Sequence, residues 1–222
     1  MFLRNVIFFS LVCLLSSSAV VSITASADTL SYGPLDFSES DLLKSQESIA
    51  DAFVYRDQDC RLNTRQIEMT ETDMLKLPQD ICHGRTKEIV YLASIDSLVG
   101  CLSQKVEWAN RTMIGSNGLG KRKSGDRKTP VGTYWLGYPR KSLQFGIFIP
   151  VGYPNKSDIA RGYTGNAIGI HGPIRPFMCL PAKSIENNWT AGCLAFARDT
   201  QIIEVSNWVL ANWPVKLTVT TD

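Results

Sequence analysis

Many short apolar runs, separated by glycine, proline and charged residues, follow Lys87, and they constrain the fold more than any other feature of the chain. Runs of this length, rich in β-branched and aromatic residues, are typical of strands that face a buried core. They predict strands at 88–94, 98–106, 131–136, 144–150, 167–170 and 215–219. One clear helix is expected late in the chain, with Asp199 as its N-cap and Pro214 as its end. This pattern predicts a mainly β domain with helices over residues 87–222.

The first 27 residues form a separate segment. Arg4 is the only charged residue before Asp28, and an apolar run leads into small residues that end in Ala25-Ser26-Ala27. This order is typical of an export signal that is cleaved after Ala27, and an uncleaved membrane anchor is the alternative. Beyond residue 27 no apolar run approaches the roughly 20 residues that a membrane helix needs, so we expect no stable membrane span after cleavage.

Residues 28–86 predict a small, mostly helical N-terminal extension with no evident chemistry. Ser38-Glu39-Ser40-Asp41 resembles a capping box, and apolar residues after it recur near helical spacing, which predicts an amphipathic helix at 38–54. A second start signal at 70–73 precedes a short helix that Pro78 ends.

Charge and metal-ligand spacing exclude several functions. Cleavage of the predicted leader would remove only Arg4 from the 23 basic residues. The remaining chain would have 22 Lys and Arg and 21 Asp and Glu. This near balance, without a long basic run, argues against nucleic acid as a partner. No C-x-x-C or H-x-x-x-H spacing accompanies Cys82-His83, so we predict neither a metal site nor a cofactor and expect His83 at the surface or in packing.

Cysteine number points to one unpaired thiol. Five cysteines follow the predicted leader, and an odd number in an exported protein leaves one over. If Cys193 is that thiol, three pairings of the other four are possible, and Cys82 with Cys101 is favoured because it closes a short loop. The alternative is that Cys193 is itself in a disulfide and another cysteine is free. The five are Cys60, Cys82, Cys101, Cys179 and Cys193.

One histidine and one cysteine form a candidate catalytic pair. His171 ends the apolar run Ile168-Gly169-Ile170, and Cys193 follows Thr190-Ala191-Gly192. An imidazole within hydrogen-bond reach can take the proton of a thiol and leave the nucleophilic thiolate. We therefore expect a lowered cysteine pKa, with a common thiolate at neutral pH. The alternative is structural: an inert thiol in a turn and a half-buried histidine with satisfied hydrogen bonds.

Glycines beside this pair supply the backbone groups that such chemistry needs. The carbonyl of Gly172 is a reasonable partner for the second ring nitrogen of His171, which it would orient. The amides of Gly192 and Cys193 are candidates for an oxyanion hole, because a glycine amide can approach a substrate carbonyl closely. The glycine- and charge-rich segment 115–128 predicts a loop that lies beside a site or is mobile.

Three motifs, in order, resemble the catalytic domain of the L,D-transpeptidases (YkuD-type) of bacterial cell walls. They are Gly125-Asp126-Arg127-Lys128-Thr129-Pro130-Val131-Gly132-Thr133-Tyr134, then Ile170-His171-Gly172, then Thr190-Ala191-Gly192-Cys193. The resemblance covers roughly 87–220 and leaves the extension at 28–86 uncovered. It implies a mixed β-sandwich, with the site in a cleft, in a protein exported to the bacterial periplasm or envelope.

The resemblance also implies a reaction on peptidoglycan. Cys193 would attack the amide between the third residue of a stem peptide and a terminal D-alanine, with His171 as base. D-Alanine would leave, and an amine of a neighbouring stem would resolve the acyl-enzyme. Carbapenems commonly acylate such a cysteine. Thr190, Arg175, Trp189 and Tyr153 are candidate substrate contacts, and ordinary packing or surface positions are the alternative for Arg175, Trp189 and Tyr153.

The sequence departs from the family pattern at two positions, and the second of them leaves the acceptor open. Thr190 stands where serine is usual and keeps the hydroxyl. Ala195 stands where many members carry arginine. The first alternative is therefore a hydrolase, an L,D-carboxypeptidase or amidase, that uses water as the acceptor. The second is a catalytically silent wall-binding protein, against which the intact His171 and Cys193 argue.

Overall fold

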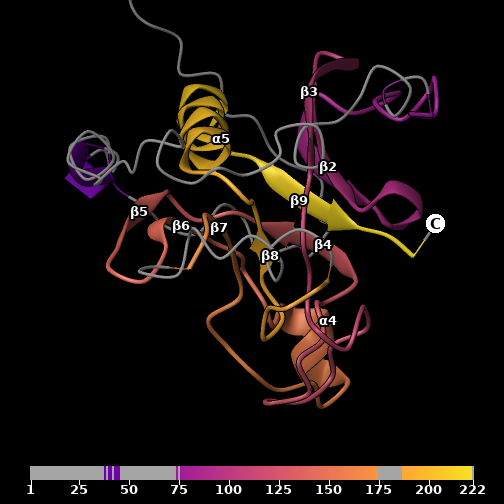
Figure 1. The fold of residues 1–222 in the computed structure, drawn as a ribbon, viewed down its shortest axis with the longest axis vertical. Helices are drawn as coiled ribbons and strands as arrows, with labels where there is room; N and C mark the ends of the chain where they lie inside the picture. The colour runs from indigo at the N-terminus through magenta and orange to yellow at the C-terminus, as the bar shows by residue number, and fades with distance from the viewer. Residues whose placement is uncertain are drawn as a thin grey trace, which may run out of the picture. The chain divides into compact units, whose positions relative to one another are not determined.

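The computed structural model describes residues 38, 40–41, 43–45, 74, 76–174 and 187–221. All of them belong to the unit Ser31–Asp222. Two β-sheets and the helix α5 are the main elements of this part of the chain (Figure 1). The fold is mainly β with mixed sheets, as the sequence predicts. The predicted leader at 1–27 lies outside the described residues, and the domain boundary at residue 86 stays a prediction.

The larger sheet has five strands in the order β3-β2-β1-β9-β4. All pairs are antiparallel except β1 with β9, which are parallel, so that the last strand of the chain lies between β1 and β4. The strands are β1 (Lys87–Leu92), β2 (Ser97–Leu102), β3 (Lys105–Arg111), β4 (Gly132–Trp135) and β9 (Lys216–Val219), and a 3-10 helix, η2 (Ala93–Ile95), joins β1 to β2.

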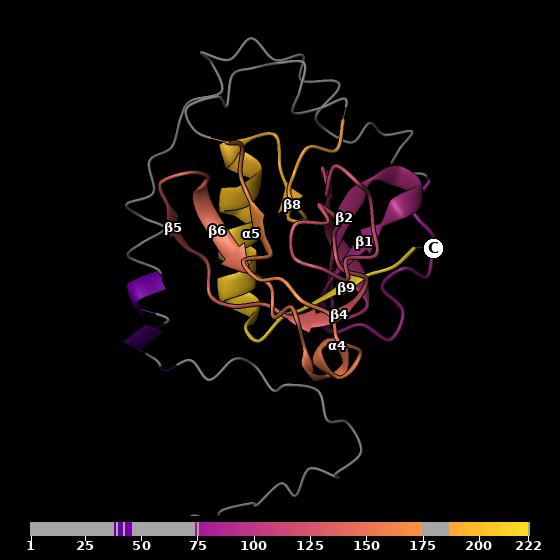
Figure 2. The same ribbon diagram turned by 90° about the horizontal axis from the view of Figure 1, so that it is seen from below.

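The smaller sheet has four strands in the order β5-β6-β7-β8. Its first two pairs are antiparallel, and the pair of β7 with β8 is parallel. Figure 2 shows β5 and β6 to the left and β1 and β2 to the right. The strands are β5 (Arg140–Ser142), β6 (Gly146–Pro150), β7 (Gly169–His171) and β8 (Leu194–Ala195).

One hydrophobic core joins the two sheets. Ile89 of β1, Ile149 of β6 and Leu217 of β9 are fully buried members of the same cluster. The opposite residues of β1, Val90 and Leu92, pack into a second cluster. Apolar side chains on both faces explain why β1 has a continuous apolar run rather than an alternating one.

A disulfide between Cys82 and Cys101 lies within that second cluster. It confirms the favoured pairing, and Cys193 is free, as the sequence predicts. Cys60 and Cys179 lie outside the described residues. His83 is exposed, which also agrees with the sequence analysis.

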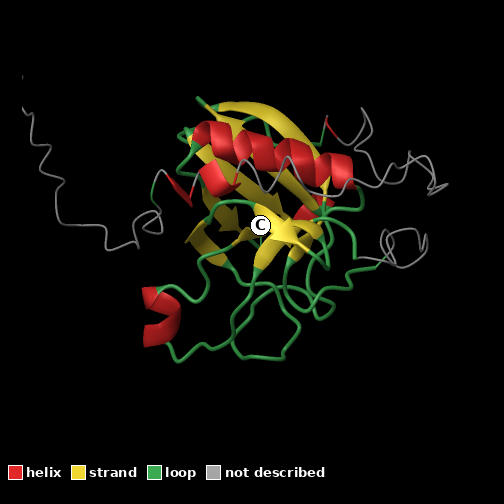
Figure 3. Ribbon diagram, turned by 90° about the vertical axis from the view of Figure 1, so that its left-hand side faces the viewer, coloured by secondary structure: helices red, strands yellow, loops and turns green. Residues whose placement is uncertain are grey.

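Helix α5 (Asp199–Asn212) completes the core. Ile202, Val205 and Val209 recur at helical spacing and are buried in the main cluster. It is the long red helix that lies along the yellow strands in Figure 3. Arg198, rather than the predicted Asp199, is the N-cap. Asp199 instead lies in the first turn, where a carboxylate complements the helix dipole.

The region predicted as one strand at 98–106 is a hairpin of β2 and β3. Ser103 and Gln104 form the turn with φ of 48° and 66°. This left-handed geometry suits a two-residue hairpin, but Ser-Gln lacks the Asn-Gly signature by which such turns are recognised. Helix α4 (Lys156–Ala160) was also not predicted, although the Asn155 and Asp158 capping box marks its start.

The described part of the extension agrees with its predicted capping box. The backbone N–H of Ser38 donates to Asp41 Oδ2 at 2.9 Å, and the N–H of Asp41 donates to Ser38 Oγ at 3.3 Å. Residues 40–41 and 43–45 are helical. The rest of the predicted helix at 38–54, and most of the one after residue 70, lie outside the described residues.

Candidate active site

A row of side chains crosses the smaller sheet and ends at the candidate nucleophile. Arg140 of β5 pairs in register with Phe148 of β6, which pairs with His171 of β7, which pairs with Ala195 of β8. Residues in register project from the same face of a sheet. Since Cys193 precedes Ala195 by two positions, strand pairing brings it beside β7 on the same side as His171.

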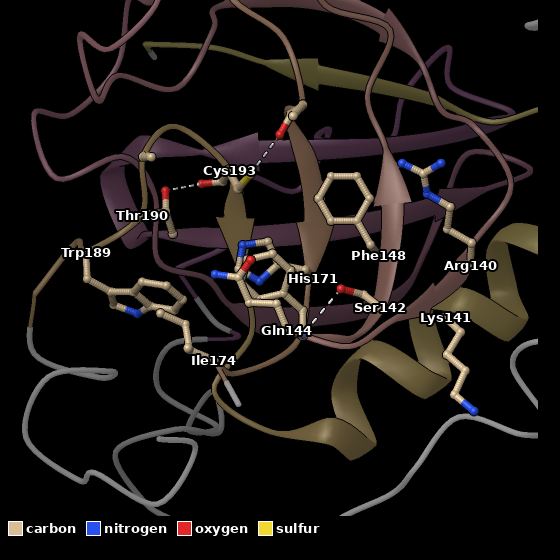
Figure 4. Close-up of a pocket in the computed structure, with 13 residues that line it drawn as sticks. Arg140, Lys141, Ser142, Gln144, Phe148, His171, Ile174, Trp189, Thr190 and Cys193 are labelled. Atoms are coloured by element: carbon tan, nitrogen blue, oxygen red, sulfur yellow. Dashed lines mark hydrogen bonds between the residues drawn. The ribbon is translucent and has the colours of Figure 1, made fainter. Parts of the chain in front are cut away.

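Arg140, Phe148, His171 and Cys193 line one pocket of about 750 Å³ (Figure 4). Its wall combines the β5–β6 hairpin, the end of β7 and the turn before β8. The lining residues are Arg140, Lys141, Ser142, Gln144, Phe145, Phe148, Ala167, His171, Ile174, Trp189, Thr190, Ala191 and Cys193.

His171 is held in one orientation by a carbonyl and by aromatic rings. Its Nδ1 lies 2.6 Å from the carbonyl oxygen of Gly172. A carbonyl only accepts hydrogen bonds, so Nδ1 carries the proton and Nε2 is left as the basic nitrogen. The imidazole stacks on Phe145, with centroids 3.8 Å apart, and lies nearly parallel to Phe148.

Burial sets the charge of this histidine. The residue is 1% exposed, and removal from water lowers its pKa to about 4, although the hydrogen bond to Gly172 acts in the opposite direction. At neutral pH His171 is therefore an uncharged imidazole whose Nε2 can accept a proton.

Cys193 has a free, partly exposed thiol. Its Sγ donates to the carbonyl of Ala167 at 3.5 Å. Burial raises the pKa of this thiol, while the backbone N–H of Gly169 and the charge of Lys121 act against that rise. The structure has no hydrogen bond between Cys193 and His171, both of which are described, although the two side chains share the pocket.

The predicted thiolate–imidazolium pair is therefore wrong for the resting protein. Both shifts disfavour the charged forms, since burial lowers the pKa of His171 and raises that of Cys193. Desolvation is the largest cause of both shifts, and neither residue is a cause of the other's shift. The arrangement suits a neutral thiol that loses its proton to a neutral imidazole only as it attacks, which is general-base catalysis.

Thr190 fixes the turn that carries the cysteine. Its Oγ1 donates to the carbonyl of Cys193 at 2.7 Å and accepts from the N–H of Gly192 at 3.1 Å. Gly192 has φ of +130°, and a Cβ there would lie 2.6 Å from the carbonyl oxygen of Lys128, so only glycine fits without a shift. The Gly192 amide would have to leave Thr190 to serve in an oxyanion hole, and that role remains a prediction.

The loop predicted at 115–128 lies beside this turn. The N–H of Ser116 donates to the carbonyl of Thr190 at 2.9 Å, and the N–H of Thr190 donates to the carbonyl of Ile114 at 3.1 Å. Thr129, just after the loop, accepts from the N–H of Gly115 at 2.9 Å. The loop therefore supports the backbone of the candidate nucleophile.

An ion pair organises the loop internally. Lys121 is 4% exposed, and its Nζ lies 2.8 Å from Asp126 Oδ1. Partial burial would raise the pKa of Asp126, but the Lys121 ammonium and three backbone N–H groups hold that pKa well below its usual range. The N–H donors belong to Lys123, Arg122 and Lys128.

The predicted substrate contacts fall in three different places. Trp189 and Thr190 line the pocket. Tyr153 does not: it is buried in the hydrophobic core, where its hydroxyl donates to the carbonyl of Thr164 at 3.3 Å and its ring meets Tyr134 edge to face. Arg175 lies outside the described residues.

The sequence analysis missed the opposite wall of the pocket. Phe145 and Phe148 lie in or beside the predicted strand at 144–150, but their contact with His171 depends on the pairing of β6 with β7. Arg140 precedes that strand in a short stretch with weak alternation. The Arg-Lys-Ser run before a glycine-containing turn was the available signal for a hairpin there.

The described residues contain neither a metal-binding cluster nor a membrane-spanning helix. No group of histidine, cysteine, aspartate and glutamate side chains among them is arranged to hold a metal ion. Among the same residues, no helix combines the length and the apolar character needed to cross a bilayer.

Comparison with solved structures shows which proteins have a similar fold. The helical cell shape determining protein Pgp2 from Campylobacter jejuni is 22% identical, with a TM-score of 0.50, and the match covers 60% of this chain and 47% of that one. Bd1075 from Bdellovibrio bacteriovorus is 18% identical, with a TM-score of 0.45 and coverage of 60% and 47%. The chain thus spans about half the length of these structures.

The family itself follows from the sequence model. Residues 96–217, more than half of the chain, match the YkuD model of the L,D-transpeptidase catalytic domain, and the chain belongs to this family. No curated protein matches it. The matched region begins in the β1–β2 connection and contains both His171 and Cys193.

Proposed function

We propose that the protein is a peptidoglycan L,D-transpeptidase that forms an acyl-enzyme on Cys193. The proposal rests on one observation in a chain that belongs to this family. A free thiol lies in the same pocket as an uncharged imidazole, which a backbone carbonyl orients. Its substrate would be a tetrapeptide stem, cleaved between the third residue and the terminal D-alanine. The proposal includes export to the periplasm or cell envelope.

The first half-reaction transfers an acyl group to sulfur. Cys193 Sγ attacks the amide carbonyl carbon while His171 Nε2 takes the thiol proton, and a tetrahedral oxyanion forms. The backbone N–H of Cys193, with that of Gly192 once released from Thr190, would stabilise this oxyanion. The C–N bond then breaks, and the proton passes from His171 to the departing amine of D-alanine, which leaves a thioester.

The second half-reaction returns the enzyme to its starting state. An amine of a neighbouring stem attacks the thioester carbonyl and gives a proton to His171. The C–S bond breaks, and the sulfur takes that proton back to regenerate the thiol. The product is a cross-link through a new amide. Water in place of the amine would give the tripeptide and make the protein a carboxypeptidase.

A role in cell shape extends this proposal. Pgp2, which shares the fold, is a helical cell shape determining protein, and its match spans less than half of its length. Cleavage or cross-linking of stem peptides would alter the cell wall and thereby the shape of the cell. We propose this role for the present protein.

Purified tetrapeptide muropeptides and mass spectrometry test the proposed reaction. Cross-linked dimers support the transferase, tripeptide with free D-alanine supports the hydrolase, and unchanged substrate supports a binding protein. The variant Cys193→Ala should yield neither products nor a carbapenem adduct, and turnover by it would remove Cys193 from the mechanism.

The two histidines of the chain provide a matched pair of variants. His171→Phe keeps the stack on Phe145 but removes the base, and we expect it to lose turnover. His83 is exposed, so His83→Phe should retain the activity of the wild type. Equal activity of the two variants would argue against His171 as the base.

A further inference from the structure

The charge of the pocket is concentrated at one end. Among the described residues that line it, Arg140 and Lys141 are the cations, and no lining residue carries a carboxylate. Both cations belong to the edge strand β5, whereas Cys193 lies at the opposite edge, before β8. A ligand with an anionic group would therefore bind in one direction, with that group toward β5.

Arg140 is positioned by the sheet rather than by a salt bridge. Its guanidinium carbon lies 5.6 Å from the centre of the Phe148 ring, a cation–π contact, and Phe148 lies opposite His171 in the next strand. Arg140 is exposed, and the described residues give it no ion pair. Its N–H donors thus remain available to a ligand while the ring restricts the side chain.

Lys141 is the weaker candidate for the same role. Adjacent residues of a strand project from opposite faces, so Lys141 does not share the row that joins Arg140 to His171. Figure 4 shows its side chain extending away from Phe148, whereas that of Arg140 extends toward the ring.

We propose that Arg140 binds a carboxylate of the donor stem peptide and so sets the direction in which the stem lies across Cys193. This inference rests on the proposed function. A guanidinium presents paired N–H groups that match the two oxygens of a carboxylate. Three strand spacings separate β5 from β8, roughly 14 Å, which an extended peptide of about four residues spans.

A stem tetrapeptide offers more than one carboxylate to such a site. The terminal D-alanine, the distal centre of the diamino acid and the preceding glutamate each carry one. The experiment therefore uses the tetrapeptide together with three forms in which one carboxylate at a time is an amide. It measures kcat/KM for the wild type, Arg140→Ala and Arg140→Lys.

We expect Arg140→Ala to lower kcat/KM on the unmodified tetrapeptide about 10- to 100-fold, the range for loss of a charge-assisted hydrogen bond. Arg140→Lys should recover only part of the loss, because an ammonium group cannot form the paired contact. One amide substrate should be equally poor for the wild type and for Arg140→Ala, and it identifies the carboxylate that Arg140 binds.

The control is Arg111→Ala, which removes another exposed arginine from the edge strand β3 of the larger sheet. It should retain the activity of the wild type. The inference is overturned if Arg140→Ala keeps the kcat/KM of Arg111→Ala. It is also overturned if each amide substrate lowers kcat/KM by the same factor for the wild type and for Arg140→Ala. A wild type that processes none of the substrates would instead remove the proposed function. Arg140→Gln, a planar neutral side chain, replaces the alanine variant if that one does not fold.

Discussion

The imidazole of His171 stacks on the ring of Phe145, with centroids 3.8 Å apart and planes inclined by 19°. The stack covers one face of the imidazole and so contributes to the burial that lowers the pKa of His171 to about 4. The candidate base is thus uncharged at neutral pH, and so is the thiol in the same pocket.

Alkylation of Cys193 should report the raised pKa of its thiol. Iodoacetamide reacts with the thiolate, so the rate of modification should keep rising with pH beyond the ordinary cysteine pKa of about 8.5. The rate is measured by mass spectrometry of the intact protein between pH 5 and 10. A plateau that begins below pH 7 would show that a stable thiolate–imidazolium pair exists.

The pH dependence of turnover should follow His171. Since burial lowers the pKa of this histidine to about 4, kcat/KM should rise through pH 4 as the imidazole loses its proton and then stay level through neutral pH. The measurement is an initial-rate profile on the tetrapeptide from pH 3 to 8. An acidic limb near the unperturbed value of about 6.5 would contradict the buried state of the ring.

The pH dependence of the free energy of unfolding should also reflect the lowered pKa of His171. The unfolded chain binds the proton at about pH 6.5 and the folded chain only at about pH 4. Below pH 6.5 the unfolded state therefore binds more protons than the folded state. The free energy of unfolding should fall by about 3 kcal/mol between neutral pH and pH 4. Urea unfolding of the wild type and His171→Phe at pH 7 and pH 4 isolates this loss, which the variant should lack. An identical pH response in both proteins would refute the prediction.

Thr190 should be replaceable by serine but not by valine. Serine keeps the hydroxyl that bridges Gly192 N–H and the Cys193 carbonyl, whereas valine keeps the shape and removes both hydrogen bonds. We expect Thr190→Val to lower kcat about tenfold and stability by about 2 kcal/mol, at roughly 1 kcal/mol per hydrogen bond. Kinetics and thermal unfolding of the two variants test this. Equal losses in both would mean that the hydroxyl has no positioning role.

Gly172 should not tolerate a side chain. A Cβ there would lie 2.9 Å from the carbonyl oxygen of Phe145 and 3.0 Å from Ile202 Cγ2. Gly172→Ala must therefore move the carbonyl that orients His171, and kcat should fall. A Cβ at Gly84 would meet nothing within 4 Å, so Gly84→Ala is the control. This variant should lose about 1 kcal/mol of stability, because the φ of Gly84 is +73°. It should keep the activity of the wild type.

Apolar patterning predicted most of the scaffold but not its smallest parts. The strands near 88–94, 131–136 and 144–150 and the helix after residue 198 have enough apolar residues to be recognised. Strands β5 and β8 have three and two residues, too few for a period to appear. The turn at Ser103 and Gln104 contradicts the usual residue preferences for its geometry.

The candidate site was predicted only where its residues follow one another in sequence. The His171–Gly172 hydrogen bond joins neighbours and could be anticipated. The aromatic wall depends on the register of β6 against β7, and the neutral state of the pair depends on burial. Neither the register nor the burial is encoded in a local motif, which explains why the predicted ion pair was wrong.

Parallel pairing of β7 with β8 has a consequence for how such proteins are recognised. The strand that ends at His171 and the strand that follows Cys193 are joined by hydrogen bonds, so the interval of 22 positions between the two candidate residues does not itself determine their separation. A change in the number of residues between β7 and β8 can alter that interval while the pairing of the two strands is retained. A search for distant homologues should therefore allow a gap of any length between the histidine and cysteine signatures.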